Sequence, residues 1–222
     1  MAVEAELKIP NATAKRIPLY YRYLRTLAES NVERIKSQEF SQLIQIPSAT
    51  IRRDFSHFGE LGRSGYGYDV SYLIEVFGHI LNTQVKKPLA VVGAGDLGKA
   101  LAKNNFRRND NLQIEAIFDN NPEIIGTMVN GIEVQSVKDF SKVIKAKGIT
   151  TAISTVPSKY SQDAVNHMVE AGITAILNFA PGRVTVPDNV KVQYIDLTTE
   201  LQTLIYFDEN FSSNHQFNFS NQ

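Results

Sequence analysis

The strongest constraint on the fold of this chain is the sequence Gly-Ala-Gly-Asp-Leu-Gly at residues 93–98. It follows an apolar run at 89–92 and begins a helix-like stretch at 99–102. About twenty residues further on, a second apolar run ends in Asp119. Strand, glycine-rich turn, helix, second strand and acid therefore occur in the order of a complete dinucleotide-binding fingerprint, not as an isolated glycine motif.

Each glycine of this turn has a separate predicted role. Gly93 permits the tight turn out of the strand, Gly95 lets the backbone approach a pyrophosphate, and Gly98 lets helix and strand pack closely. The helix that follows offers unpaired N–H groups and a partial positive charge to the phosphates. The cofactor-binding residues predicted in the turn are Gly93, Ala94, Gly95, Asp96, Leu97 and Gly98.

Asp119 is expected to accept hydrogen bonds from the adenosine ribose hydroxyls. Its carboxylate would repel a 2′-phosphate, and residues 120–122 contain no arginine that would neutralise one. The predicted ligand is therefore NADH or NAD+, not its phosphorylated counterpart. The alternative is a domain of this fold that has lost its ligand or binds another nucleotide.

Beyond the fingerprint, predicted strands and helices alternate. Strands are expected at 88–93, 113–118, 150–154, 174–178 and 191–195, and helices at 96–105, 137–147, 158–171 and 197–207. This alternation predicts an α/β domain with a Rossmann-type, doubly wound parallel sheet, which binds ligands at the carboxyl ends of its strands. Two loops at such ends are predicted to bind the nicotinamide half, through Thr155, Val156, Pro157, Asn178, Phe179, Ala180 and Pro181. The alternative is that both are ordinary turns containing proline.

The residues before the fingerprint predict a second kind of domain. An apolar stripe indicates a helix at 13–30, and Ser37, Ser48 and Asp69 are potential caps of three more helices. The glycine-rich segment 59–68 suits a tight two-stranded ribbon with its tip near Arg63. Helices and ribbon together predict a winged-helix, or helix-turn-helix, domain. The expected domains are 1–84 and 85–208, followed by a flexible tail at 209–222.

The third predicted helix presents a candidate DNA-binding surface. At about 100° per residue, Ile51, Phe55 and Phe58 point inward. The residues predicted to contact DNA lie on and beside the opposite side, or at the ribbon tip: Ser48, Thr50, Arg52, Arg53, Ser56, His57 and Arg63. Residues 1–68 hold ten basic and seven acidic side chains, whereas the remainder holds thirteen and sixteen. The alternative is that this charged helix face is merely solvated.

Composition excludes several other functions. The chain has no cysteine, so it forms no disulfide or thiolate metal site, and no metal is expected. None of its four histidines is placed as a proton donor beside a hydride path, and no tyrosine is followed four residues later by lysine. The chain is therefore expected to bind a nicotinamide cofactor without being an enzyme. An NAD-dependent oxidoreductase with an accessory N-terminal domain remains the alternative. We expect a cytoplasmic protein without a membrane span or signal peptide.

Taken together, these residues resemble the Rex family of bacterial redox-sensing transcriptional repressors. The resemblance covers about residues 10–208, and its segments are 19–24, 51–59, 65–70, 93–98, 117–119, 177–181 and 196–201. It implies a homodimer that binds palindromic operator DNA and is released by NADH. It also implies that the C-terminal helix, 197–207, is exchanged between the two copies.

The resemblance further implies a switch contact across the dimer between Arg22 and Asp196. The chain departs from the family pattern at two positions. Asn104 replaces a tyrosine that helps to couple the nicotinamide to the switch, and Arg183 stands where the family tends to be apolar. A Rex-like DNA-binding protein with a weakened NADH response is therefore a further alternative.

Overall fold

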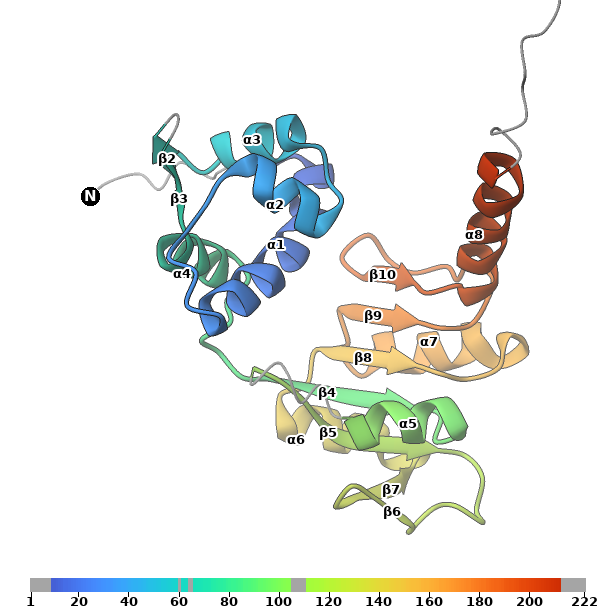
Figure 1. Ribbon diagram of the computed structural model, residues 1–222. Coiled ribbons are helices and arrows are strands. Elements are labelled where there is room, and N and C mark those ends of the chain that lie inside the picture. Colours follow the sequence, from blue (N-terminus) through green and yellow to red (C-terminus); the bar gives the residue numbers. More distant parts are fainter. Residues whose placement is uncertain (1–8, 60, 64–65, 105–110, 213–222) are drawn as a thin grey trace, which may run out of the picture. The chain divides into compact units, whose positions relative to one another are not determined.

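The computed structural model describes residues 9–59, 61–63, 66–104 and 111–212 (Figure 1). The chain divides between Val85 and Lys86 into two compact units. The boundary expected from the sequence lies one residue earlier. Each unit has its own hydrophobic core, so each is described by itself.

The first unit is a four-helix domain with a small antiparallel sheet. Its helices are α1 (Asn11–Glu29), α2 (Ser37–Ile44), α3 (Ser48–Ser56) and α4 (Val70–Ile80). Its strands are β1 (Arg34–Ile35), β2 (Gly62–Arg63) and β3 (Gly67–Asp69), in the order β1-β3-β2. The predicted winged-helix fold class is confirmed, although strand β1 was not expected.

Four aromatic rings form the centre of this unit's core. Tyr20, Phe40, Phe55 and Phe77 are almost completely buried, and their ring centroids lie 5.3–6.3 Å apart. The predicted inward positions of Ile51 and Phe55 on α3 are correct. Phe58 lies beyond the end of this helix, and its ring packs edge-on against Phe77 at 5.4 Å.

The predicted caps are correct at one helix and wrong at two. Asp69 caps α4, because its Oδ1 accepts a hydrogen bond from the Tyr72 amide at 3.0 Å. Ser37 and Ser48 are the first residues of α2 and α3, not their caps. Their hydroxyls instead lie 3.4 Å from Nη1 of Arg52, which joins the beginnings of the two helices.

The second unit is built on one seven-stranded sheet in the order β10-β9-β8-β4-β5-β7-β6. The strands are β4 (Lys87–Val92), β5 (Leu112–Asp119), β6 (Met128–Val129), β7 (Ile132–Ser136), β8 (Thr151–Ser154), β9 (Ala175–Asn178) and β10 (Lys191–Tyr194). All neighbours pair in parallel except β6 and β7, whose hairpin was not predicted. The sheet order confirms the doubly wound α/β class.

Helices cover this sheet on both faces. They are α5 (Asp96–Asn104), α6 (Phe140–Lys147) and α7 (Ser161–Glu170), with short 3₁₀ turns η1 (Val137–Asp139) and η2 (Ser158–Tyr160). A further helix, α8 (Leu197–Ser212), follows β10 and is exposed. Side chains alternate along β4, so Ala90 and Val92 pack with α6 and α7, whereas Leu89 and Val91 pack with the α5 side. Figure 1 shows α5 on one face and α6 and α7 on the other.

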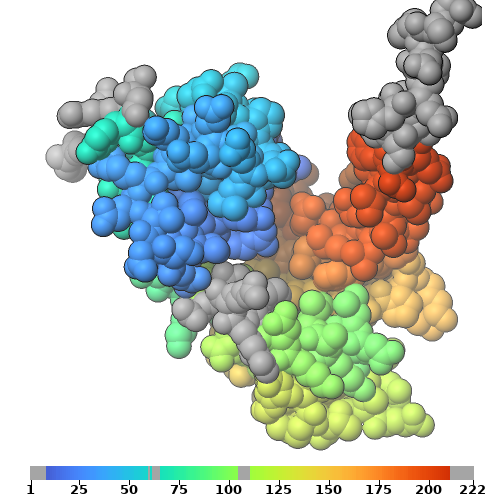
Figure 2. Space-filling model, in the orientation of Figure 1, coloured from blue at the N-terminus to red at the C-terminus, as the bar shows by residue number. Residues whose placement is uncertain are grey.

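Helix α8 is longer and more exposed than the sequence predicts. It continues to Ser212, so the first four residues of the expected flexible tail are helical, and residues 213–222 lie outside the described part. No glycine or proline interrupts 197–212, which explains the extension. Apolar side chains on this helix are 50–64% exposed, and its surface is red in Figure 2: Leu197, Leu201, Leu204, Ile205, Tyr206 and Phe207.

Candidate functional site

The glycine-rich turn lies at the carboxyl end of β4, in the middle of the sheet. Gly93 has a φ of +97°, a left-handed conformation that favours glycine. A Cβ on Gly98 would overlap the Gly93 carbonyl oxygen, so only a residue without a side chain permits this contact between helix and turn. A Cβ on Gly95 would meet no protein atom within 4 Å. The space beside Gly95 is therefore open to a ligand.

The structure brings Asp119 to this turn. One carboxylate oxygen, Oδ2, accepts a hydrogen bond from the Ala94 amide at 2.6 Å, and the other accepts one from the Asn121 amide at 2.8 Å. Asp119 therefore stabilises the turn itself. The contact to ribose hydroxyls, for which lone pairs of both oxygens remain, stays a prediction.

The two predicted loops of the nicotinamide side start at the same edge of the sheet. The register pairs Val92 with Ser154 and Ser154 with Asn178, so β4, β8 and β9 end side by side. Asn178 is buried; its Nδ2 lies 3.3 Å from Ser161 Oγ, and its Oδ1 accepts from the Ala180 amide at 3.3 Å. The amide of Asn178 is thus engaged within the protein.

The other loop residues are divided between the two faces of the sheet. Val156 packs with the α6–α7 core, whereas Phe179 packs with the core on the α5 side. Pro157 precedes η2, Ala180 is buried and Pro181 is exposed. Phe179 therefore shares the α5 face with the turn, and Val156 does not.

Helix α3 presents most of its predicted DNA-contacting side chains to solvent. Arg52, Arg53 and Ser56 are exposed, and Ser48, Thr50 and His57 are half-buried. Ser56 Oγ donates a hydrogen bond to the Arg53 carbonyl at 2.7 Å, so this hydroxyl is engaged within the helix. Arg63 pairs with Gly67 through the β2–β3 ladder, but its side chain lies outside the described part of the chain.

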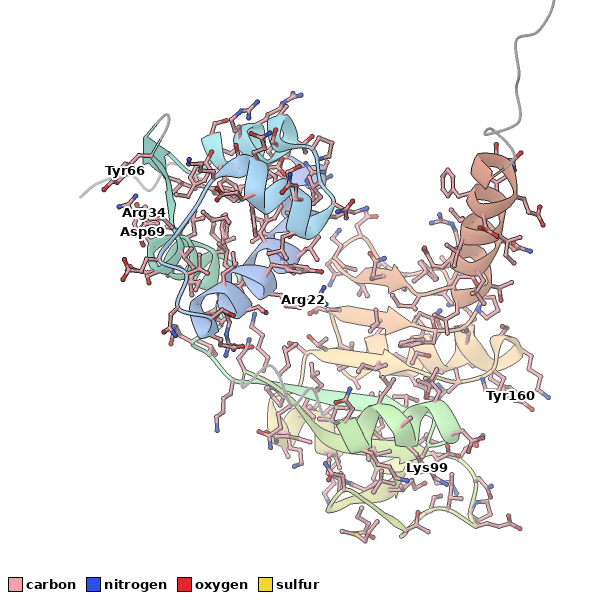
Figure 3. All side chains as sticks on the ribbon, viewed as in Figure 1. Arg22, Arg34, Tyr66, Asp69, Lys99 and Tyr160 are labelled. Carbon is pink, nitrogen blue, oxygen red and sulfur yellow. The ribbon has the colours of Figure 1, made fainter. Side chains whose placement is uncertain are left out.

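A stacked arginine connects β1 to the base of the ribbon (Figure 3). The Arg34 guanidinium carbon lies 4.3 Å from the ring centroid of Tyr66, and Nη2 lies 3.8 Å from the Asp69 carboxylate. All three residues are well exposed, so this contact contributes little to stability. The backbone ladder between β1 and β3, in which Arg34 is paired with Asp69, brings these side chains together.

The sequence analysis missed a buried carboxylate on α3. Asp54 is 2% exposed and accepts hydrogen bonds from three residues of α1: Thr13 Oγ1 at 2.8 Å, Arg16 Nε and Nη2 at 2.6 and 2.7 Å, and Tyr20 Oη at 2.5 Å. A signal was available, because Asp54 lies three residues after Ile51, on the apolar side of the helix. An acid there requires a partner.

These contacts decide the protonation state of the cluster. Burial alone would raise the pKa of Asp54, but hydrogen bonds from Arg16, Tyr20 and Thr13 outweigh it and hold this pKa below its usual range. Burial and the same carboxylate raise the pKa of Tyr20. At neutral pH Asp54 is therefore an anion and Tyr20 a neutral donor.

The three proposed switch positions lie at exposed or half-buried sites. Arg22 projects from α1 (Figure 3), and its guanidinium carbon lies 5.1 Å from the ring centroid of Tyr23. Asn104 is the exposed last residue of α5. Arg22 and Asp196 belong to different units, so their separation is not defined. Arg183 lies with its guanidinium carbon 5.7 Å from the Tyr194 ring centroid.

Asp196 has a structural role that the sequence analysis missed. Its Oδ1 accepts hydrogen bonds from the amides of Thr198 and Thr199 at 3.0 and 3.2 Å, and Oδ2 accepts from Thr199 Oγ1 at 2.7 Å. These bonds lower the pKa of Asp196. Asp196 thus caps the beginning of α8.

The described residues include neither a metal-binding cluster nor a helix suited to crossing a membrane. No cluster of three or more histidine or acidic side chains there has the arrangement of a metal site. No helix in the same ranges has both the length and the apolar character that crossing a bilayer requires.

Comparisons with known proteins match both units. A family model described as a CoA binding domain matches residues 84–182, and one described as a putative DNA-binding protein N-terminus matches residues 8–56. The redox-sensing transcriptional repressor Rex 2 of Enterococcus faecalis is 65% identical over 207 residues, which cover 93% of this chain and 96% of the relative.

Two solved structures of the repressor RSP are similar throughout, each with a TM-score of 0.83. RSP in complex with β-NAD+ and operator DNA is 31% identical, and the match covers 96% of this chain and 99% of RSP. RSP in complex with β-NADH is 30% identical, with 94% and 99% covered.

The Asp54 cluster generates a prediction about stability. Asp54→Ala leaves the buried Tyr20 hydroxyl and the Arg16 guanidinium without their acceptor, so the free energy of unfolding should fall by about 3 kcal/mol. Urea denaturation of the full chain, followed by circular dichroism, measures the loss. Glu29→Ala, which removes an exposed acid at the end of α1, is the matched control.

The variant Asp54→Asn tests how much the charge of Asp54 contributes to the free energy of unfolding. The folded pKa of Asp54 lies below its unfolded value of about 3.9. The contribution of the charge is therefore complete above that pH and declines as the pH falls toward the folded pKa. The stability difference between the native chain and Asp54→Asn should shrink between pH 7 and pH 3. A difference that stays constant across this range would show that the charge is not its source.

Proposed function

The chain belongs to the Rex family of redox-sensing transcriptional repressors, and on that basis we propose that it represses genes by binding operator DNA as a homodimer. It leaves the DNA when the ratio of NADH to NAD+ rises. The observation that carries this proposal is the presence, in one chain, of a winged-helix unit with an exposed α3 and a complete dinucleotide turn joined to its acid. The activity belongs in the cytoplasm, where DNA and the nicotinamide pool meet.

The comparisons favour a regulator over an enzyme. The relatives are named as transcriptional repressors, so the alternative of an oxidoreductase is set aside. NADH and NAD+ are the sensed ligands, and no hydride transfer is required of the protein. We expect the nicotinamide ring to be buried against apolar side chains, which would favour neutral NADH over the positively charged ring of NAD+, because desolvating a charge is costly.

Asp119 should decide the choice of cofactor. Its carboxylate lies beside the turn, where it would repel the 2′-phosphate of NADPH. Asp119→Ala should weaken NADH binding and reduce the preference for NADH over NADPH, as measured by calorimetry. Because Asp119 also holds the Ala94 amide, Asp119→Asn is the companion variant that keeps an oxygen acceptor without the charge. Equal affinities of the native protein for NADH and NADPH would contradict the assignment.

DNA binding is assigned to the exposed side of α3 and to the ribbon. Arg53 is exposed on α3 and is assigned to a guanine edge in the major groove, whereas Arg52, which contacts the starts of α2 and α3, is assigned to a phosphate. Arg63 at the ribbon is assigned to the minor groove, where A·T-rich sequences attract a guanidinium. A basic residue of the second unit, Lys142, provides a control outside this surface.

Arg53→Ala should weaken operator binding by about 1–3 kcal/mol and relax specificity at one base pair. Arg52→Ala should weaken binding to all sequences alike and reduce the slope of log affinity against log salt by about one unit. Lys142→Ala should change neither quantity. Affinity is measured by fluorescence anisotropy on a labelled operator at several salt concentrations. If Arg53→Ala keeps the native affinity and specificity, α3 does not contact the bases.

Helix α8 is assigned to the dimer. Leu197, Leu201, Leu204 and Ile205 recur at helical spacing and remain more than half exposed in one copy of the chain. A second copy of the chain would cover them, and the exchange of α8 between copies follows the pattern that the family resemblance implies. Arg22 would then contact Asp196 of the other copy in one of the two states.

The capping role of Asp196 makes a sharp test of this switch possible. Asp196→Asn keeps an oxygen for the Thr198 and Thr199 amides but loses the charge, whereas Asp196→Ala loses both. If the charge pairs with Arg22, both variants should change the effect of NADH on operator affinity, a coupling of about 1–3 kcal/mol in typical cases. Operator affinity is measured with and without saturating NADH, and sedimentation checks that each variant remains a dimer.

A change in Asp196→Ala alone would show that the residue acts only as a cap, and the proposed switch would be wrong. Asn104→Tyr completes the series, because it restores the side chain typical of the family. It should increase the NADH effect if Asn104 weakens the coupling. An equal effect in the native protein and in Asn104→Tyr would remove the alternative of a weakened NADH response.

A further inference from the structure

The hydroxyl of Thr155 joins the end of β8 to the glycine-rich turn of β4. Thr155 Oγ1 lies 2.7 Å from the Gly93 carbonyl oxygen and 3.2 Å from that of Val92, and its amide donates to the Val92 carbonyl at 2.9 Å. We propose that Thr155 is a positioning residue, which fixes the Gly93–Gly95 backbone and so sets its affinity for a pyrophosphate. This inference rests on the proposed nicotinamide site and revises the direct cofactor contact that the sequence predicts for Thr155.

The turn is held from two strands, and Thr155 supplies one of the two sides. From the β5 side, the Gly93 amide donates to the Phe118 carbonyl at 2.8 Å, and the Ala94 amide donates to Asp119 at 2.6 Å. From the β8 side, the Thr155 hydroxyl donates to the Gly93 carbonyl. Gly93 has no side chain that would restrict its φ, so other contacts must hold it at the observed positive value. These tertiary hydrogen bonds therefore select the conformation.

The space around the Gly93 carbonyl leaves little room for a substitute donor. A Cβ on Gly98 would overlap this oxygen, and one on Gly93 itself would lie 2.9 Å from Thr155 Oγ1. Helix α5 thus packs against one side of the carbonyl and Thr155 against another. Without the hydroxyl, the carbonyl would be left without this partner, which is costly for an enclosed acceptor.

Positioning matters here because the turn would bind phosphate through its backbone. Backbone N–H groups hold an anion well when they already point at it before it arrives. A turn released from β8 would have to be ordered during binding, and the lost conformational freedom would weaken the complex. The Thr155 hydroxyl thereby acts on the ligand through Gly93.

The preceding residue, the last of β8, provides a matched control. Ser154 is fully buried, and its hydroxyl is the one buried side-chain polar atom of the described residues that lacks a hydrogen-bond partner. Ser154→Ala therefore removes a buried hydroxyl beside Thr155 without breaking a hydrogen bond. Thr155→Val removes the hydroxyl and keeps the branched shape, and Thr155→Ser keeps the hydroxyl and removes the methyl group.

The experiment applies two measurements to the full chain and its variants. Calorimetry gives the affinity for NADH, and amide hydrogen exchange of the ligand-free protein reports on residues 94–98. Thr155→Val should bind NADH about tenfold more weakly, as expected for the loss of one hydrogen bond to an enclosed acceptor, and exchange at 94–98 should accelerate. Thr155→Ser and Ser154→Ala should behave like the native chain.

Two results would overturn the proposal. One is native behaviour of Thr155→Val in both measurements. The other is an equal loss of NADH affinity in Thr155→Val and Thr155→Ser, together with faster amide hydrogen exchange throughout β8. This result would show that Thr155 acts through the packing of its side chain and not through its hydroxyl. If the native chain itself binds no NADH, the proposed function fails, and exchange at 94–98 still decides the role of Thr155.

Discussion

The arrangement of the first unit depends on one buried anion. Asp54 would be prohibitively expensive in this core without partners, and α1 supplies all of them from Thr13, Arg16 and Tyr20. Apolar packing alone would allow α3 to slide or rotate on α1, because rings and branched side chains tolerate several arrangements. Four directional hydrogen bonds to one carboxylate prevent such sliding or rotation of α3. The backbone of the exposed Arg53, one residue before Asp54, is therefore held in a defined position on α3.

The second unit meets a related problem at one edge of its sheet. Both faces of its sheet are apolar, and successive side chains along each strand point alternately into the hydrophobic core on one face and the core on the other. The carboxyl edge is different, since β4, β5, β8 and β9 all end there in tight turns whose backbone groups need partners. Side chains supply these partners: Asp119 at the end of β5 for Ala94, Thr155 after β8 for Gly93, and Asn178 at the end of β9 for Ala180 in the loop that follows it. The groups that keep this edge rigid also surround the space in which a nucleotide is proposed to bind.

The sequence predicts those parts of the molecule that depend on local patterns. The spacing from Gly93 to Asp119 correctly predicts a turn and an acid that meet, and the inward positions of Ile51 and Phe55 follow from helical periodicity. Contacts between distant residues were missed because no local pattern encodes them. Asp54 meets residues about forty positions away, and the Thr155 hydroxyl meets a carbonyl in another strand. The short strands β1 and β6 are not predicted because a strand of two residues shows no periodicity. The sequence predicts an end of α8 that is too early, because its apolar spacing becomes irregular after Phe207 while the helix continues to Ser212.

The exposed helix α8 has a consequence for how much of this protein a cell must make. A helix of 16 residues without a buried face is close to the length at which isolated helices are only marginally stable. In a dimer that covers α8, the ordering of this helix and the meeting of two chains become one equilibrium, governed by mass action. At low total concentration most chains are monomers, so the concentration of the DNA-binding dimer rises more steeply than the total concentration of chain. Repression would therefore have a threshold in protein dosage, separate from any signal carried by the nicotinamide pool.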